Sequence, residues 1–331
     1  MATLKDVAKL ACVDVSTVSR ALNNSSYVHP DTKARVYAAA RELGYRPNAM
    51  AQALRQGRRH ILGVVVPRLH LAIFSEILQG IETEADRLGY ATMVCVTQDD
   101  PRIERDRLNR LRNGFVDGII IASTGRNNRL LRDIQAEGVA MVQLVRDQDP
   151  RISSVVADYE TCGYDAVRYL HGLGCRRIGL IDGAQHLAPY RLRREGYVRA
   201  VEKFGLEPLF SESGRQVNSF EYGYDCALQL LTRYGGLDAI IASVDVQGLG
   251  AMRALEEQGL LVPEDLRVMS LTGHEVGGML PVSMTSMEMP AREMGAKAAA
   301  MAVEQIEAAA DQKPGVQHLS FSAVLVERDS T

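Results

Sequence analysis

The stretch "VDVSTVSRAL" (residues 13–22) alternates valines with small hydroxylated residues and one arginine. Asp14 is a candidate N-cap, and the helix that it would begin has one apolar and one polar side. The apolar side holds Val18, Ala21 and Leu22. The polar side holds Ser16, Ser19 and Arg20. Such a helix can pack on a neighbour and still leave an arginine-bearing face available.

A shorter helix is predicted just before this one. Thr3 and Asp6 have the spacing of a capping box, and Leu4, Val7, Ala8 and Ala11 follow helical spacing. Two short helices joined by a tight turn, the second with a polar face, are typical of a helix-turn-helix. Arginine can contact guanine through two hydrogen bonds, and serine or threonine can bond bases or phosphates. The alternative is a small helical hairpin with a solvated face.

Two further helices are expected before the chain changes character. The first begins at Pro30 and stops at Gly44. Its buried stripe is predicted to hold Val36, Ala39, Ala40 and Leu43. The second would span residues 49–56, which is too short to be stable in water unless something packs on it. Leu54 would then suit a wedge in a DNA minor groove, whereas an unstructured linker is the alternative.

The charge of the chain is divided unevenly. Residues 1–60 hold ten Lys and Arg against four Asp and Glu, whereas the remainder holds 28 against 37. A small basic head on a larger acidic body suggests that the head meets a polyanion, although a solvated charge fluctuation gives the same count. The five cysteines form no CxxC pair, which argues against a zinc site or a disulfide framework. With neither a signal segment nor an apolar run of membrane length, we expect a cytoplasmic protein with no membrane partner.

From Ile61 onward, apolar strands alternate with helical stretches. This order predicts parallel sheets with helices on both faces. The first series of expected strands covers residues 61–67, 91–97, 116–122 and 139–145. The second series covers residues 176–182, 237–243 and 266–271. Expected helices include residues 74–90, 103–112, 193–205, 221–233 and 245–258. Two such series make two lobes, and ligands bind at the carboxyl ends of the strands, in the cleft between them.

The head resembles the DNA-binding domain of lac repressor family (LacI/GalR) regulators, through "LKDVAKLACVDVSTVSRALNN" and "DTKARVYAAARELGYRPNAMAQALR". The resemblance implies a helix-turn-helix domain over residues 1–47 and a hinge helix over residues 48–58. It implies that the second helix enters the major groove and that Ala51 and Leu54 enter the minor groove. The DNA-binding residues implied in this way are Thr3, Val15, Ser16, Thr17, Ser19, Arg20, Asn23, Tyr45, Asn48, Ala51 and Leu54. Val15 departs from the polar or aromatic reader of several relatives, so base preference there does not carry over.

Residues 59–331 resemble the two-lobed α/β effector domain of the same family, which is similar to periplasmic sugar-binding proteins. The resemblance implies a first lobe of about residues 59–158 and 291–323 and a second of about residues 159–290. The effector-binding residues expected from strand ends and from the resemblance are Arg68, Phe74, Arg146, Arg193, Asn218, Asp245, Thr272 and His274. The segment "SLTGHEVGG" departs from the family's Gly-aromatic-Asp pattern, which affects Thr272 and His274.

Arg68 and Arg146 follow strands of the first lobe, and Arg193 is expected opposite them. Because forked guanidinium donors match phosphate oxygens, we expect an anionic effector, in the first place a sugar phosphate. The surroundings of these arginines resemble trehalose repressors, whose effector is trehalose 6-phosphate. The segment that begins at "GHEVGGMLPV" resembles gluconate repressors, which bind a sugar acid. Both resemblances point to a negative charge on the effector.

No catalytic or metal-binding constellation is recognisable in the sequence. Walker, HExxH and GxSxG motifs are missing, and "GLGAMR" lacks the third glycine of a dinucleotide loop. We therefore expect a regulator without a cofactor, a repressor of carbohydrate-utilisation genes that binds palindromic operator DNA. A homodimer rather than a coiled-coil tetramer is expected, because "LSFSAVLVERDST" is followed by no leucine heptads. The alternative is a cytosolic sugar-binding or sugar-processing α/β protein that binds no operator.

Overall fold

The computed structural model describes residues 2–23, 27–45, 58–211, 218–273, 275–309, 312 and 314–331. The chain divides into a head, residues 1–59, and a body, residues 60–331. The head contains helices α1 (Leu4–Leu10), α2 (Val15–Asn23) and α3 (Pro30–Glu42). No helix in the described residues is long and apolar enough to cross a membrane.

The head folds around a small apolar core. Val7, Val18 and Val36 are fully buried, one from each helix. The predicted capping box is present, because the Thr3 side chain accepts from the Asp6 amide while the Asp6 carboxylate accepts from the Thr3 amide. The prediction for Leu43 is wrong: its side chain is 36% exposed. Leu43 follows the last residue of α3 and caps the helix, so its side chain lies beyond the stripe that faces the core.

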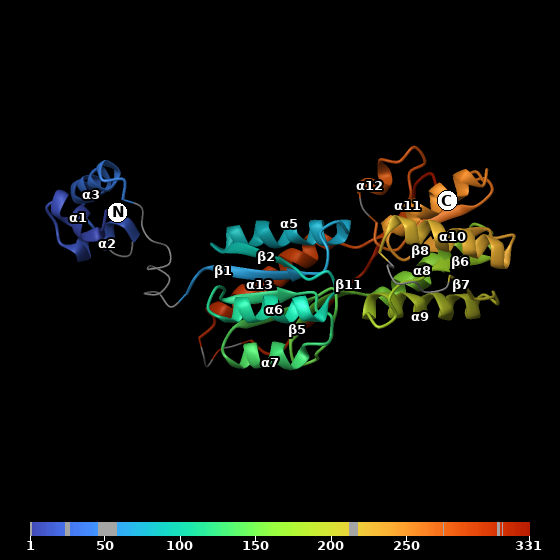
Figure 1. Ribbon diagram of the computed structural model, residues 1–331, viewed down its shortest axis with the longest axis horizontal. Helices are drawn as coiled ribbons and strands as arrows, with labels where there is room; N and C mark the ends of the chain where they lie inside the picture. Colours follow the sequence, from blue (N-terminus) through green and yellow to red (C-terminus); the bar gives the residue numbers. More distant parts are fainter. Residues whose placement is uncertain are drawn as a thin grey trace. The chain divides into compact units, whose positions relative to one another are not determined.

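The first lobe of the body contains a six-stranded sheet in the order β11-β5-β4-β3-β1-β2, and all of its strand pairs are parallel. Its strands are β1 (Ile61–Val66), β2 (Ala91–Val96), β3 (Gly118–Ile121), β4 (Ala140–Leu144), β5 (Ser153–Ala157) and β11 (His318–Phe321). Helices α5 (Ala72–Arg87) and α13 (Ala291–Glu307) pack together on one face. Helices α6 (Pro101–Arg112) and α7 (Asn128–Ala136) cover the other (Figure 1).

The second lobe contains a six-stranded sheet in the order β12-β10-β9-β8-β6-β7. Its strands are β6 (Ile178–Ile181), β7 (Leu209–Phe210), β8 (Ala239–Ala242), β9 (Arg267–Ser270), β10 (Thr285–Glu288) and β12 (Val324–Val326). Helices α8 (Tyr159–Gly172) and α9 (Ala188–Lys203) pack together, as do α10 (Phe220–Tyr234) and α11 (Asp245–Glu257). The short helix α12 (Glu275–Gly278) precedes β10.

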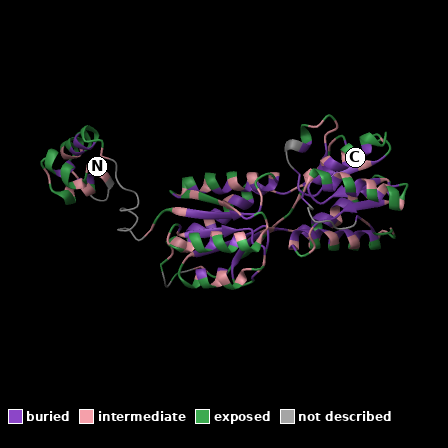
Figure 2. Ribbon diagram, in the orientation of Figure 1, coloured by how far each residue is buried: buried purple, intermediate pink, exposed green. Residues whose placement is uncertain are grey.

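The inner strands β1, β3, β4, β6 and β8 are buried because helices cover both faces of each sheet (Figure 2), whereas the edge strands β2, β11 and β12 are partly exposed. Alternate residues of one strand face opposite helix pairs: in β8, Ile241 joins the core formed with α8 and α9, and Ile240 joins the core formed with α10 and α11. This two-sided burial explains why the strands are continuous apolar runs in the sequence.

One strand departs from the expected parallel arrangement. β12 pairs with β10 in the antiparallel direction. The chain leaves β11 in the first sheet at Phe321 and enters β12 in the second sheet at Val324. The parallel strands run toward the region between the lobes, so a strand that starts there after two connecting residues must run the other way. Residues after 323, which the resemblance assigns to neither lobe, therefore complete the second sheet.

Candidate functional site

The polar face of α2 is available on the surface of the head. Val15 is 40% exposed, and Ser16 and Arg20 are also exposed, whereas Val18 on the opposite side is fully buried. The Arg20 guanidinium donates to the Ser16 carbonyl at 3.3 Å and to the Thr17 hydroxyl at 3.2 Å. Arg20 therefore lies along its own helix, and its bonds are to exposed groups that water or DNA can replace.

The other predicted DNA-binding residues have varied surroundings. Thr3 is exposed and takes part in the capping box. Ser19 is half-buried on α2, and Tyr45 packs against the apolar core of the head. Asn23 ends α2, but its side chain lies outside the described part of the chain. Outside the described residues altogether are Asn48, Ala51 and Leu54, so the hinge helix stays a prediction.

Two adjoining cavities lie in the body where the strands of both sheets end. The smaller, about 30 Å³, is lined by Phe74, Arg146, Arg193, Asn218 and Thr272 of the expected set, with Tyr159 and Tyr190. The larger, about 130 Å³, is lined by Asp245, His70 and again Thr272. Small-molecule sites usually measure roughly 300–1,000 Å³, so a ligand of sugar size requires the lining side chains to move apart.

Arg193 is the most deeply buried cation of this site, with 2% of its surface exposed. Its Nη1 and Nη2 atoms donate to the carbonyl oxygens of Ser243 and Leu271, at 3.2 and 3.0 Å. Its Nε has no hydrogen-bond partner among the described residues. An unfilled donor on a buried cation is costly, which makes Arg193 a candidate ligand contact.

The backbone around Arg193 is fixed by close helix packing. A Cβ atom on Gly163 of α8 would lie 2.1 Å from the Arg193 carbonyl oxygen, and one on Gly196 would lie 1.9 Å from the Glu160 carbonyl oxygen. Only glycine permits this approach of α8 and α9. The paired helices therefore hold Arg193 beside the ring of Tyr159, with 4.9 Å between the guanidinium carbon and the ring centroid.

Two tyrosines complete the smaller cavity, and neither was among the expected site residues. The Tyr159 hydroxyl donates to the Val145 carbonyl at 3.0 Å, and burial raises the pKa of Tyr159 to about 12. The Tyr190 hydroxyl donates to the side-chain oxygen of Asn218. Tyr159 follows β5, a strand that was not predicted from the sequence. Had this strand been predicted, Tyr159 would have been a candidate as a polar residue at a strand end.

Asp245 begins α11 beside the larger cavity. Its carboxylate accepts from the Ser270 hydroxyl and, at 3.0 Å, from the Gly273 amide. Its own amide donates to the Thr272 hydroxyl at 3.1 Å. Asp245 and Thr272 are thus linked at the carboxyl end of β9, whereas His274 lies outside the described residues.

Arg68 and Arg146 are brought together, but a carboxylate stands between them. Arg146 Nη1 donates to Asp99 Oδ1 at 2.6 Å, and Arg68 Nε lies 3.7 Å from Asp99 Oδ2. Arg146 lines the smaller cavity, and Arg68 lines neither cavity. Asp99 follows the expected strand over residues 91–97, so the strand-end criterion that selected the arginines could have selected it too.

Backbone strain is concentrated at the same strand ends. Gln98, Asp99 and Val145 have φ values of 57°, 59° and 66°. This region is unfavourable for residues with a Cβ atom, most of all for a β-branched residue such as Val145. Strain of this kind is found preferentially at ligand sites.

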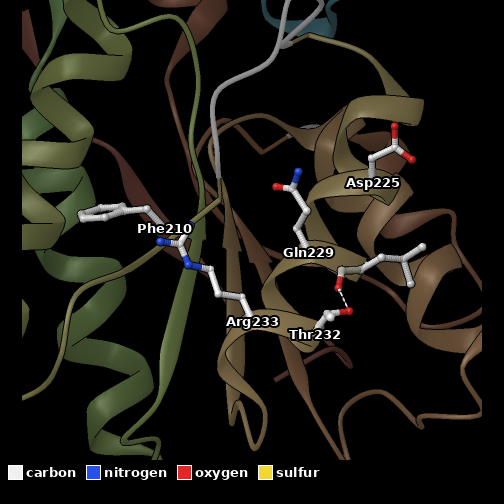
Figure 3. Close-up of a pocket in the computed structure, with 6 residues that line it drawn as sticks. Phe210, Asp225, Gln229, Thr232 and Arg233 are labelled. Carbon is white, nitrogen blue, oxygen red and sulfur yellow. Dashed lines mark hydrogen bonds between the residues drawn. The ribbon is translucent and has the colours of Figure 1, made fainter.

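A larger pocket of about 590 Å³ lies elsewhere on the second lobe (Figure 3). It is lined by Phe210, Asp225, Leu228, Gln229, Thr232 and Arg233. Its polar residues are exposed, and it contains none of the expected effector residues. Among the described residues, no group of three His, Cys, Asp or Glu side chains could hold a metal ion.

The head and body both match known families. Residues 3–48 match the model of bacterial regulatory proteins, lacI family, and residues 167–331 match a periplasmic binding protein-like domain. A ribose operon repressor of Halalkalibacterium halodurans is 31% identical over 93% of this chain and 91% of its own length. The chain belongs to the lacI family of bacterial regulatory proteins.

Other members of the lacI family agree with this assignment. The HTH-type transcriptional repressor PurR of Haemophilus influenzae is 31% identical over 97% of this chain and 95% of its own length. A lac repressor dimer bound to operator and the anti-inducer ONPF superimposes with a TM-score of 0.87 and 28% identity, over 100% of this chain and 99% of that one. A complex of the regulator CelR with cellobiose superimposes with a TM-score of 0.74 and 27% identity, over 100% of both chains. The chain is therefore a DNA-binding transcriptional regulator and not an enzyme.

Proposed function

We propose that this lacI-family chain represses carbohydrate-utilisation genes in the cytoplasm by binding a palindromic operator as a homodimer. The observation that carries the proposal is the exposure of Ser16 and Arg20 on the polar face of α2, opposite the buried Val18. A helix presented in this way fits the major groove, where arginine and serine can read base edges. The lac repressor relative bound to operator supports this use of the fold.

The effector of this proposal is a sugar-type molecule that carries an acidic group and binds in the body at the two cavities. Asp245, Asn218 and Thr272 supply groups for hydroxyls, and Arg193 supplies an unfilled cationic donor. The similarity to a ribose operon repressor and to a CelR–cellobiose complex supports a carbohydrate as the effector. Binding there would change operator affinity through a coupling free energy of roughly 1–3 kcal/mol.

Selection of DNA duplexes from a random pool by the full-length chain tests the first part. We expect a palindrome whose half-sites lie about one helical turn apart. If no sequence is enriched above background, operator binding is contradicted, and a sugar-binding protein that binds no DNA is favoured. A thermal-shift screen of sugars, sugar acids and sugar phosphates tests the second part, since ligands of the native state raise the melting temperature.

A further inference from the structure

Asp99 lies between the two arginines of the first lobe that were expected to bind an effector anion. Its carboxylate accepts from Arg146 at 2.6 Å and lies 3.7 Å from Arg68 Nε. Arg146 is 4% exposed, and its Nη1 atom also donates to the Ser123 carbonyl at 3.3 Å. An internal carboxylate therefore already pairs with the two arginines that were expected to bind a ligand phosphate.

The turn that carries Asp99 is fastened to the first strand. The Thr97 amide donates to the Val66 carbonyl at 3.0 Å, and the Gln98 amide donates to the Pro67 carbonyl at 2.8 Å. Gln98 and Asp99 then both adopt left-handed backbone angles. Two consecutive residues in this region persist only where the surrounding bonds impose it. The position of the Asp99 carboxylate is thus set by the fold and not by the flexibility of a surface loop.

The charges at the site leave one cation in excess. Among the described residues that line the cavities or pair with lining residues, the cations are Arg68, Arg146 and Arg193, and the anions are Asp99 and Asp245, with His70 counted as neutral. Arg146 and Arg68 share the carboxylate of Asp99, although the Nε atom of Arg68, like that of Arg193, has no hydrogen-bond partner among the described residues. Arg193 donates to two carbonyl oxygens and pairs with no carboxylate among the described residues. The excess charge therefore resides on Arg193.

We propose that Asp99 acts as a built-in counter-ion that restricts the pocket to effectors with a single negative charge, held by Arg193. This inference rests on the proposed sugar-type effector and chooses between its two acidic classes. A sugar carboxylate carries one charge, whereas a phosphate monoester carries about −1.5 to −2 at pH 7. A dianion beside Asp99 would meet like charge, and displacing Asp99 would break its ion pair with the buried Arg146.

Calorimetry on the full-length chain at pH 7 tests the proposal with two matched sets of probes. The sets are glucose, glucuronate and glucose 6-phosphate, and ribose, ribonate and ribose 5-phosphate. Each set is titrated into the wild type, Asp99→Asn and the control Asp100→Asn. Asp100 is the next residue in the chain and carries the same charge, but it caps α6 and lines neither cavity. Asparagine also caps helices, so the control changes only the charge.

In at least one set, the wild type should bind the carboxylate more than about ten-fold tighter than the phosphate, because like-charge contacts are strongly unfavourable. Asp99→Asn should reduce or reverse this preference, and Asp100→Asn should keep it. Phosphate binding as tight as carboxylate binding in the wild type would overturn the proposal even if Asp99→Asn fails to fold. An unchanged preference in a folded Asp99→Asn variant would also overturn it. If no probe binds while operator binding persists, the sugar assignment itself fails, and this inference fails with it.

Discussion

The Arg193 guanidinium stacks on the Tyr159 ring at 4.9 Å and donates hydrogen bonds to the carbonyl oxygens of Ser243 and Leu271. No carboxylate pairs with this buried cation among the described residues. Burying a charge in this way costs free energy that carbonyl bonds and ring stacking offset only in part. Such an arrangement is expected of a side chain that serves ligand binding rather than stability of the fold.

Arg193→Met should therefore abolish effector binding while changing the free energy of unfolding by less than about 1 kcal/mol. Removal of the buried charge offsets the loss of two hydrogen bonds. Calorimetry and urea unfolding measure the two effects. Arg194→Met is the matched control, because Arg194 bonds the buried Asp182 at 2.9 Å and lines neither cavity. It should cost about 1–3 kcal/mol of stability and keep effector affinity. Effector binding that persists in Arg193→Met, or that is lost in Arg194→Met, would contradict this role of Arg193.

Gln98→Gly should stabilise the body by about 0.5–1 kcal/mol. The exposed Gln98 has a φ of 57°, a region that costs a residue with a Cβ roughly 1–2 kcal/mol. Glycine removes that cost but loses part of the gain through the entropy of the unfolded chain. Thermal unfolding would measure the change. Gln98→Ala keeps the Cβ and should give no increase, so equal melting temperatures for both variants would argue against strain at this turn.

The stability of the first lobe should depend on Asp149 in acid. A hydrogen bond from Arg151, with another from Arg132, lowers the pKa of Asp149 to about 2. A carboxyl with a depressed pKa contributes stability above its unfolded pKa near 3.8 and loses it as pH falls toward 2. Asp149→Asn should thus flatten the fall in unfolding free energy between about pH 4 and pH 2, by up to about 2 kcal/mol. Urea unfolding at a series of pH values measures this free energy. An equally steep fall with pH in the wild type and in Asp149→Asn would refute the contribution of Asp149.

Arg20→Ala should weaken operator binding by about 1–3 kcal/mol and blur the preference at one base pair. Arg20 is exposed on α2 and bonded only to its own helix in the head. Fluorescence anisotropy with the selected operator and its single-base variants measures both quantities. Arg41→Ala removes another exposed arginine, near the end of α3, and should affect all sequences alike. If Arg20→Ala also weakens all sequences equally, Arg20 contacts phosphate and not a base.

The edge strand β2 should lie in the homodimer interface. Met93 and Val94 point to opposite faces, and they are 36% and 44% exposed, so neither face of this apolar edge is covered. Unprotected apolar edges are prone to association. Val94→Asp should shift the protein toward monomers in sedimentation velocity runs. Leu261→Asp, at a residue that is 63% exposed in the second lobe, should leave the dimer intact. A stable wild-type monomer that binds its operator specifically would refute the dimer itself.

The sequence by itself determined the three helices of the head and most strands of the body, because spacing and apolar runs are local properties. It missed β5, β7, β10, β11 and β12, which are short and gain their stability from pairing with distant strands. It also predicted one effector site, and five of the residues in that prediction line a single cavity: Phe74, Arg146, Arg193, Asn218 and Thr272. Strand ends meet at one edge in such a fold, so position along the chain was enough.

Only the tertiary structure decided what these side chains do to one another. Asp99 and Arg146 are 47 residues apart in the chain, and their pairing depends on the order of strands in the sheet and on two left-handed residues. Residue types show that arginines are present, but they do not show which arginine is already neutralised. That distinction moves the free positive charge from the pair Arg68 and Arg146 to Arg193, because charge balance depends on distances in space and not along the sequence.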